Sequence, residues 1–413
     1  MYFILIGIPL VIAPFTSDYF YLPKLLVLYF IVTLLIIIHF FSLKKKKFDN
    51  DLITKVLIIY LGILVVSTLF STDPFTSLYG KFRRQEGLFA LISYSLVFLF
   101  SKTYFIEDKQ LDRFLNTSMV VVALYGLSQY FGFDPIPRDE IRMGWTTRAF
   151  STIGNPNFLG SYLVLMLPIP IIRFLEKGSK YHLLVASFVF SCLLVTFTRS
   201  AQLGFLVIFL LVAFSIIRNK LLLKRFIILS TLLVVLTLGF NEHSQGMVLG
   251  RFLSIGRDVQ TVIDQDEGFE KAGSIRIYIW TRSLALVIDR PLLGYGPEAL
   301  EMNFVNRYRD EMIEQFGVIY LVDKVHNEYL HIAVSSGILS LIAYLVFISL
   351  VVKKGIKMIK INRSYLPYFI AVIAYLVQAF FNISVVSVAY IFWLYLGIIS
   401  NENVFTNEID HNT

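Results

Sequence analysis

Cysteine is nearly absent from this sequence, because Cys192 is its only occurrence and it lies inside a long apolar run. A single cysteine excludes a disulfide or a thiolate metal cluster within one chain. Side-chain packing is the role that these apolar surroundings favour for Cys192.

Charged residues are also scarce, at 16% of the chain, whereas hydrophobic residues make up 56%. This composition argues against an ordinary soluble domain, which needs more charge at its surface. The apolar residues form runs long enough to cross a hydrocarbon core, which takes roughly 20 residues of helix. The sequence therefore predicts an all-α polytopic membrane protein with about 12 transmembrane helices.

The predicted spans are separated by short loops, with one long interruption. They fall at residues 1–16, 23–43, 52–71, 87–104, 113–133, 157–175, 181–198, 200–217, 224–240, 334–352, 365–381 and 385–400. The chain thus divides into helices 1 to 9 over residues 1–240, one large loop between helices 9 and 10 over residues 241–333, and helices 10 to 12 with a short tail over residues 334–413. The first span has no basic residue before it and no small-residue cleavage site after it, so we expect a retained helix rather than a signal peptide.

Lysine and arginine are enriched in every second predicted loop, beginning with the run Lys44 to Lys47. An excess of basic residues in short loops is typical of the cytoplasmic side of a membrane. The alternation predicts a cytoplasmic C-terminus. It also accounts for much of the net charge of +8 without a nucleic-acid partner.

The loops on the opposite, extracytoplasmic side contain basic residues that the orientation rule does not explain, and most are arginines. They include Arg83, Arg84, Arg138, Arg142, Arg148 and Arg199 in short loops, and Arg251, Arg257, Arg276, Arg282, Arg290, Arg307 and Arg309 in the long loop. A guanidinium group binds phosphate oxygens in pairs, so this cluster favours a pyrophosphate-linked lipid as ligand. Snorkelling or headgroup binding is the competing explanation for any one of them.

The long loop contains two helix-like stretches. Residues 274–291 read as a mixed helix in which Arg276 and Trp280 lie one turn apart on one face. Residues 298–316 carry an apolar stripe every fourth position, which predicts an amphipathic helix across the mouth of the bundle. The stripe consists of Leu300, Phe304, Tyr308, Met312 and Phe316.

The stretch "STIGNPNFLGSYL" brings two amides to the start of a predicted span. Asn-Pro favours a turn, and Asn157 is suited to cap the helix that follows. A second interpretation is that Asn155 and Asn157 contact a sugar or a phosphate.

Two of the six histidines occur in "KVHNEYLH", where the long polar loop meets an apolar run. His326 and His331 point about 140° apart on a helix, so they are not expected to share a site. An imidazole can take a proton from a hydroxyl near neutral pH. Beside arginines that bind a pyrophosphate, His326 is therefore a candidate general base; an interfacial anchor is the alternative role.

Five motifs, in this order and spacing between about residues 75 and 345, together resemble the O-antigen ligase and polymerase family of membrane glycosyltransferases. They are "YGKFRRQEGL", "STIGNPNFLGSYL", "FTRSAQLG", "SIRIYIWTRSLALVIDRPLLGYGPEAL" and "KVHNEYLHIAVSSGIL". The resemblance implies an enzyme of the bacterial inner membrane with an extracytoplasmic active site, formed partly by the large loop. It implies transfer of a glycan from undecaprenyl pyrophosphate to a hydroxyl of a glycan, lipid or protein acceptor, with no nucleotide sugar, metal or cofactor.

The resemblance also implies residue roles. Arg199 and Arg276 would bind the donor pyrophosphate, Arg83 or Arg84 would join them, and His326 would activate the acceptor hydroxyl. Further substrate contacts are expected from Asn155, Asn157, Trp280, Asn327 and Glu328. A single displacement at the anomeric carbon predicts inversion of configuration.

Other functions remain open at this point. A metal-dependent transferase is suggested by Asp264 and Asp266 in "IDQDEG", or by Asp18 with Asp139 or Glu140. A flippase for lipid-linked glycans would also have about 12 helices, although the predicted spans carry few of the ionisable groups that transporters need. A protein O-oligosaccharyltransferase would share the same motifs.

Overall fold

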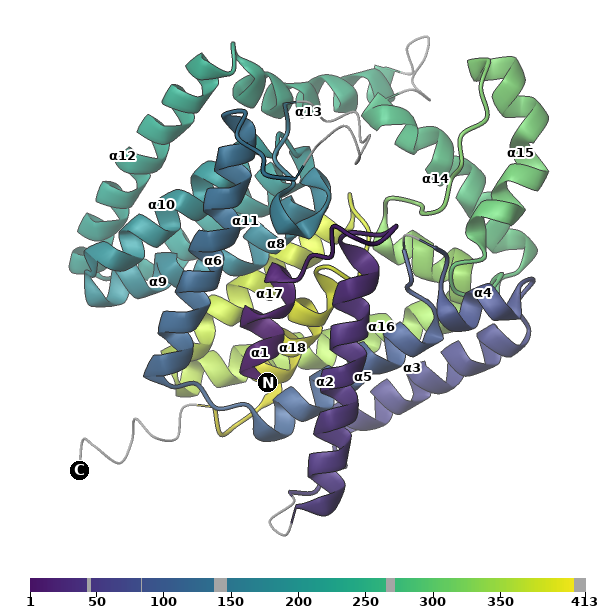
Figure 1. Cartoon of the computed structure of the whole chain (residues 1–413), viewed down its shortest axis with the longest axis horizontal. Coiled ribbons are helices and arrows are strands. Elements are labelled where there is room, and N and C mark those ends of the chain that lie inside the picture. The colour runs from purple at the N-terminus through teal and green to yellow at the C-terminus, as the bar shows by residue number, and fades with distance from the viewer. Residues whose placement is uncertain (43–45, 83, 137–146, 265–271, 405–413) are drawn as a thin grey trace.

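The structure, a computed structural model, describes residues 1–42, 46–82, 84–136, 147–264 and 272–404. Within these ranges every regular element is a helix and no strand is present, which confirms the predicted all-α class. Figure 1 shows a bundle of long helices with α13, α14 and α15 gathered along one side of it.

The helices follow one another with short connections. The first half contains α1 (Tyr2–Ile6), η1 (Ile8–Leu10), α2 (Tyr21–Phe41), α3 (Leu52–Leu69), α4 (Pro74–Tyr79), α5 (Leu88–Tyr104), α6 (Lys109–Tyr130), η2 (Ser151–Ile153), α8 (Pro156–Met166), α9 (Pro168–Lys177) and α10 (Lys180–Val195). The second half contains α11 (Arg199–Ile216), α12 (Lys220–His243), α13 (Met247–Asp264), α14 (Ala272–Asp289), α15 (Leu300–Phe316), α16 (Glu328–Ile361), η4 (Arg363–Tyr365), α17 (Leu366–Ala379) and α18 (Ala389–Ser400).

Among the described residues, six helical segments are long and apolar enough to cross a membrane. They are Tyr21–Phe41, Leu52–Leu69, Pro156–Lys177, Arg199–Ile216, Lys220–His243 and Glu328–Ile361. Three shorter apolar helices are Leu88–Tyr104, Lys180–Val195 and Ala389–Ser400. The chain is thus an integral membrane protein with several spans, whereas the count of about 12 remains a prediction.

The predicted helix at residues 1–16 is wrong. Helix α1 ends at Ile6, and a 3-10 turn, η1, follows it. Pro9 lies inside that turn, where a proline removes a backbone N–H and blocks continuation of an α-helix. The N-terminal segment instead inserts Ile4, Leu5 and Ile8 into the bundle core.

The bundle is built around α18, whose residues from Ala389 to Ser400 are all buried. Helix α18 packs against α5, and their backbones come close because residue 397 is glycine. A Cβ atom there would lie 2.5 Å from the Cβ of Ser101 and 2.6 Å from the carbonyl oxygen of Phe98. In contrast, α12 directs most of its apolar side chains outward, as expected of a helix that faces lipid.

Helices α14 and α15 form a second hydrophobic core with the segment that precedes α16. The predicted stripe on α15 is confirmed for Leu300, Phe304, Tyr308 and Met312, all of which are buried. They pack with Tyr278 of α14 and Val325, which comes just before α16. Ile279 and Val322 of this core also line the cavity that is described in the next section.

The turn "PLLGYGPEA", residues 291–299, lies against a kink in α16. Gly337 interrupts α16 with φ of 83°, and a Cβ atom there would lie 2.0 Å from the carbonyl oxygen of Leu292. The backbone N–H groups of Tyr295 and Gly296 donate to the carbonyl oxygens of Val334 and Ser335. The turn therefore connects α14 and α15 to α16, which begins two residues after His326.

Candidate functional site

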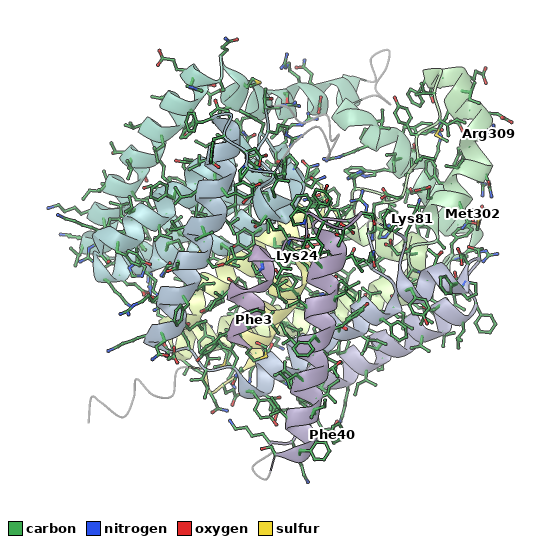
Figure 2. The ribbon with its side chains drawn as sticks, viewed as in Figure 1. Phe3, Lys24, Phe40, Lys81, Met302 and Arg309 are labelled. Carbon is green, nitrogen blue, oxygen red and sulfur yellow. The ribbon has the colours of Figure 1, made fainter. Side chains whose placement is uncertain are left out.

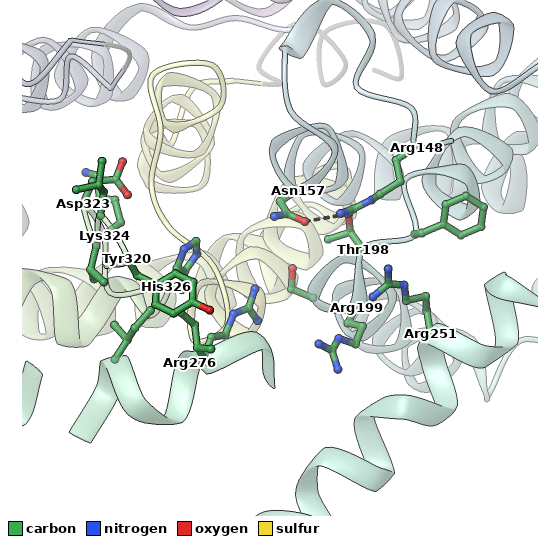
Figure 3. Close-up of a pocket in the computed structure, with 16 residues that line it drawn as sticks. Arg148, Asn157, Thr198, Arg199, Arg251, Arg276, Tyr320, Asp323, Lys324 and His326 are labelled. Atoms are coloured by element: carbon green, nitrogen blue, oxygen red, sulfur yellow. Dashed lines mark hydrogen bonds between the residues drawn. The ribbon is translucent and has the colours of Figure 1, made fainter. Parts of the chain in front are cut away.

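A cavity of about 310 Å³ lies where the N-terminus of α11, the start of α14 and the segment before α16 meet. Its lining is unusually basic. The polar lining residues are Arg148, Asn157, Thr198, Arg199, Ser200, Arg251, Arg276, Tyr320, Asp323, Lys324 and His326 (Figure 3).

Arg199 reaches the cavity because it is the first residue of α11. The chain turns sharply before it: Phe197 has φ of 49°, and Thr198 occupies the N-cap position. The Arg199 guanidinium donates to the carboxylate of Asp258 and, over 3.3 Å, to the hydroxyl of Ser254, both on α13. With 19% of its side chain exposed, Arg199 connects α11 to α13 at the edge of the cavity.

Arg276 extends from the first turns of α14 toward Arg199 (Figure 3). Burial and the neighbouring charge of Arg199 lower the pKa of Arg276 to about 10. Arg276 has no hydrogen-bond or ion-pair partner among the residues that the structure describes. The group remains charged at neutral pH and is available to an anion.

His326 faces the same cavity in a constrained backbone conformation, with φ of 57°. This is the left-handed region, which costs a residue with a side chain about 1 kcal/mol or more. The Nδ1 atom of His326 is buried and has no partner in the described part of the chain. Burial, reinforced by Arg276 and opposed by Asp323, lowers the pKa of His326 to about 4, so the imidazole is neutral at physiological pH.

The residues on either side of His326 are anchored. The indole Nε1 of Trp280 donates to the carbonyl oxygen of Val325 over 3.0 Å. The side chain of Asn327 caps α16 by accepting from the N–H of Leu330 over 3.1 Å. These two contacts fix the backbone on both sides of the imidazole.

Asp323 and Lys324 are held from a distant part of the sequence. The Arg84 Nε lies 2.5 Å from Asp323 Oδ2. Although burial alone would raise the pKa of Asp323, the Arg84 guanidinium lowers it below its usual value. Lys324 Nζ lies 3.1 Å from Glu86 Oε2 and 2.5 Å from Glu298 Oε1, with all three side chains buried.

The structure thus brings together four of the residues expected at the site, namely Arg199, Arg276, His326 and Asn157. The other expected residues that the structure describes lie outside the lining. Arg84 is paired with Asp323, Trp280 packs against Phe380 and Phe381 and holds Val325, and Asn327 serves as a helix cap. Arg83 is not among the described residues.

The expected helix cap at Asn157 is wrong, and Glu328 lies outside the lining. Asn155, not Asn157, caps α8, because its side chain accepts from the N–H of Asn157. The Asn157 side chain is instead free to accept from Arg148 Nη2 over 3.1 Å. Glu328 points away from the cavity into the bundle, where the hydroxyls of Tyr344 and Tyr375 donate to it over 3.2 Å and 3.5 Å.

The carboxylates considered for metal binding have other surroundings. Asp18 accepts from the N–H groups of Phe20, Tyr21 and Leu22 at the start of α2. Its suggested partners Asp139 and Glu140, and Asp266 of the other suggested pair, fall outside the described residues, and no side chain is described for Asp264. In the described part, no three histidine, cysteine, aspartate or glutamate side chains are grouped as a metal would require.

Arg148, Arg251, Tyr320, Asp323 and Lys324 line the cavity but were not selected as site residues from the sequence. Arg148 and Arg251 belong to the extracytoplasmic arginines, so their charge was a usable signal. No feature of the neighbouring sequence indicated that Lys324, two residues before His326, would be paired with Glu86.

The fold and the site define a class of protein: a helical membrane protein in which a neutral histidine and several arginines line one cavity. Residues 184–345 match the family model described as O-antigen ligase. This match supports, for residues 184–345, the resemblance to the O-antigen ligase and polymerase family that the motifs carry. A comparison of the chain with curated proteins found no match. The family relationship indicates an enzyme that acts on lipid-linked glycans.

Proposed function

We propose that the protein transfers a glycan from undecaprenyl pyrophosphate to an acceptor hydroxyl in this cavity, on the extracytoplasmic face of the bacterial inner membrane. The observation that supports the proposal most directly is the placement of a neutral His326 beside Arg276 and Arg199 in one cavity. A base and a pair of phosphate-binding groups are the parts that this transfer needs.

The donor pyrophosphate binds between Arg276 and Arg199. Arg276 has no partner among the described residues, whereas Arg199 is paired with Asp258. A pyrophosphate brings negative charge to both guanidinium groups and relieves the repulsion that lowers the pKa of Arg276. These groups also stabilise the charge that grows on the leaving pyrophosphate in the transition state.

His326 accepts the proton of the acceptor hydroxyl as its oxygen attacks the anomeric carbon of the donor. The bond from that carbon to the pyrophosphate oxygen breaks, and undecaprenyl pyrophosphate leaves with the bonding electrons. Because nucleophile and leaving group occupy opposite faces of the carbon in one displacement, the product has inverted configuration. The reaction needs no metal, because arginine charge replaces it at the pyrophosphate.

Transfer by purified protein in liposomes tests this proposal. The donor is an undecaprenyl-pyrophosphate-linked glycan, EDTA is present, and a lipid, a glycan and a peptide are offered separately as acceptors. We expect a new glycosidic bond of inverted configuration, and the identity of the acceptor separates a ligase, a polymerase and a protein O-oligosaccharyltransferase. Retention of configuration, or loss of activity in EDTA, would overturn the mechanism, and movement of the donor across the bilayer without product would favour a flippase.

A further inference from the structure

The cavity contains more positive charge than a donor pyrophosphate requires. Four guanidinium groups line it, on Arg148, Arg199, Arg251 and Arg276. Lys324 also lines the cavity, but its positive charge is paired with the buried carboxylates of Glu86 and Glu298. Of the four arginines, only Arg199 has a carboxylate partner among the described residues.

The four guanidinium groups occupy two regions. Figure 3 shows Arg276 next to His326 and facing Arg199, whereas Arg148 and Arg251 lie beyond Arg199, near Asn157 and Thr198. The electrostatics follow the same division. Burial and Arg199 lower the pKa of Arg276 to about 10, and burial and Arg251 lower the pKa of Arg148 to about 10. Each region therefore places two like charges close together, an arrangement that a bound anion stabilises.

Arg148 is held in a defined orientation. Its Nε donates to the carbonyl oxygen of Thr196 over 2.8 Å, and its Nη2 donates to Asn157 Oδ1 over 3.1 Å and to Thr198 Oγ1 over 3.0 Å. These contacts leave the two N–H groups of Nη1 without a partner in the described part of the chain. A charged donor held in a fixed orientation in this way can donate to an oxygen of a carboxylate or a phosphate.

A pyrophosphate diester carries one negative charge on each phosphate group, and Arg276 and Arg199 can bind both. We propose that Arg148 and Arg251 form a second anion subsite in this cavity, which binds an acidic substituent, a carboxylate or a phosphate, of the transferred glycan or of its acceptor. This inference rests on the proposed function and specifies its substrates: the transferred glycan, the acceptor or both are acidic.

Transfer kinetics test the subsite directly. Prenyl-pyrophosphate-linked saccharides are prepared with a neutral sugar or with a uronic acid, and acceptors with a neutral sugar, a uronic acid or a sugar phosphate. We expect wild type to favour an acidic substrate by roughly tenfold to a hundredfold in kcat/KM, the range that a charged hydrogen-bond pair gives. If the preference appears only when the donor is acidic, the subsite binds the transferred glycan; if it appears only when the acceptor is acidic, the subsite binds the acceptor.

In Arg148→Gln and Arg251→Gln the preference for acidic substrates should disappear while neutral pairs still react. Arg309→Gln is the matched control, since it removes the same charge from α15, where Arg309 is exposed at the edge of the molecule (Figure 2). Equal losses for neutral and acidic substrates, or no preference in wild type, would overturn the subsite. Absence of transfer with every substrate pair would instead count against the proposed function.

A binding measurement separates the two arginine pairs without catalysis. Calorimetry with the full chain in detergent uses geranyl pyrophosphate as a soluble donor analogue and inorganic phosphate as the second anion. Wild type saturated with geranyl pyrophosphate should still bind phosphate, and Arg148→Gln should lose that second binding while keeping the first. If Arg148→Gln and Arg251→Gln weaken geranyl pyrophosphate as strongly as Arg276→Gln does, both residues belong to the donor site and the second subsite is wrong.

Discussion

Lys324 and Glu86 form a buried ion pair, with Nζ 3.1 Å from Oε2, although 238 residues separate them in the chain. Glu298 supplies a second carboxylate at 2.5 Å. The ammonium group thus connects the loop before α5, the loop before α15 and the segment that carries His326. Burial raises the pKa of Glu298. Burial alone would lower the pKa of Lys324, but the two carboxylates together outweigh it and raise that pKa above its usual value.

Replacing Lys324 with methionine should destabilise the protein strongly, because it leaves two carboxylates buried without their cation. Removing one member of a buried ion pair costs about 3 to 5 kcal/mol. The measurement is the thermal midpoint of the purified protein in detergent. The double variant Lys324→Met with Glu298→Gln should recover part of the loss, since it removes one of the stranded charges; an unchanged midpoint in the single variant would contradict the structural role.

His326→Ala should lower the rate of glycan transfer by about 100-fold to 10,000-fold, the usual contribution of a general base. Binding of geranyl pyrophosphate should be retained, because Arg199 and Arg276 remain. His243→Ala is the control, since His243 lies at the end of α12 and does not line the cavity. Equal transfer rates for His326→Ala and wild type would leave His326 as an anchor only.

The rate of transfer should decrease at low pH, and protonation of His326 should set the pH of this decrease, which is called the acidic limb below. Only the neutral imidazole accepts a proton, and the pKa of His326 is lowered to about 4 in the free protein. Activity measured as kcat/KM should therefore fall as the pH decreases through about 4 and remain level from pH 6 to 8. Bound pyrophosphate offsets the charge of Arg276, so the limb in kcat should lie at a higher pH than the limb in kcat/KM.

The sequence allowed local features to be predicted better than distant pairings. The α15 stripe depends on spacing along one helix, and the arginines and His326 were found through charge and motif order. The role of Arg84 could not be predicted, because its charge alone suggested a phosphate ligand and its pairing with Asp323 spans 239 residues. For the same reason, the ion pairs of Lys324, two residues before His326, could not be predicted. Pro9, in contrast, was a local signal against a continuous helix over residues 1–16.

Arg276→Gln should weaken binding of geranyl pyrophosphate by roughly tenfold to a hundredfold, since it removes a charged hydrogen-bonding group that has no partner in the described chain. It should also raise the pKa of His326, because Arg276 is the nearby charge that contributes most, after burial, to lowering it. The acidic limb of kcat/KM should then move to higher pH, which a structural defect alone would not produce. Arg276→Lys keeps the charge but not the planar fork, so it should restore the position of the limb and only part of the affinity. If Arg276→Gln leaves both the affinity and the limb unchanged, Arg276 neither binds the donor nor sets the protonation of His326.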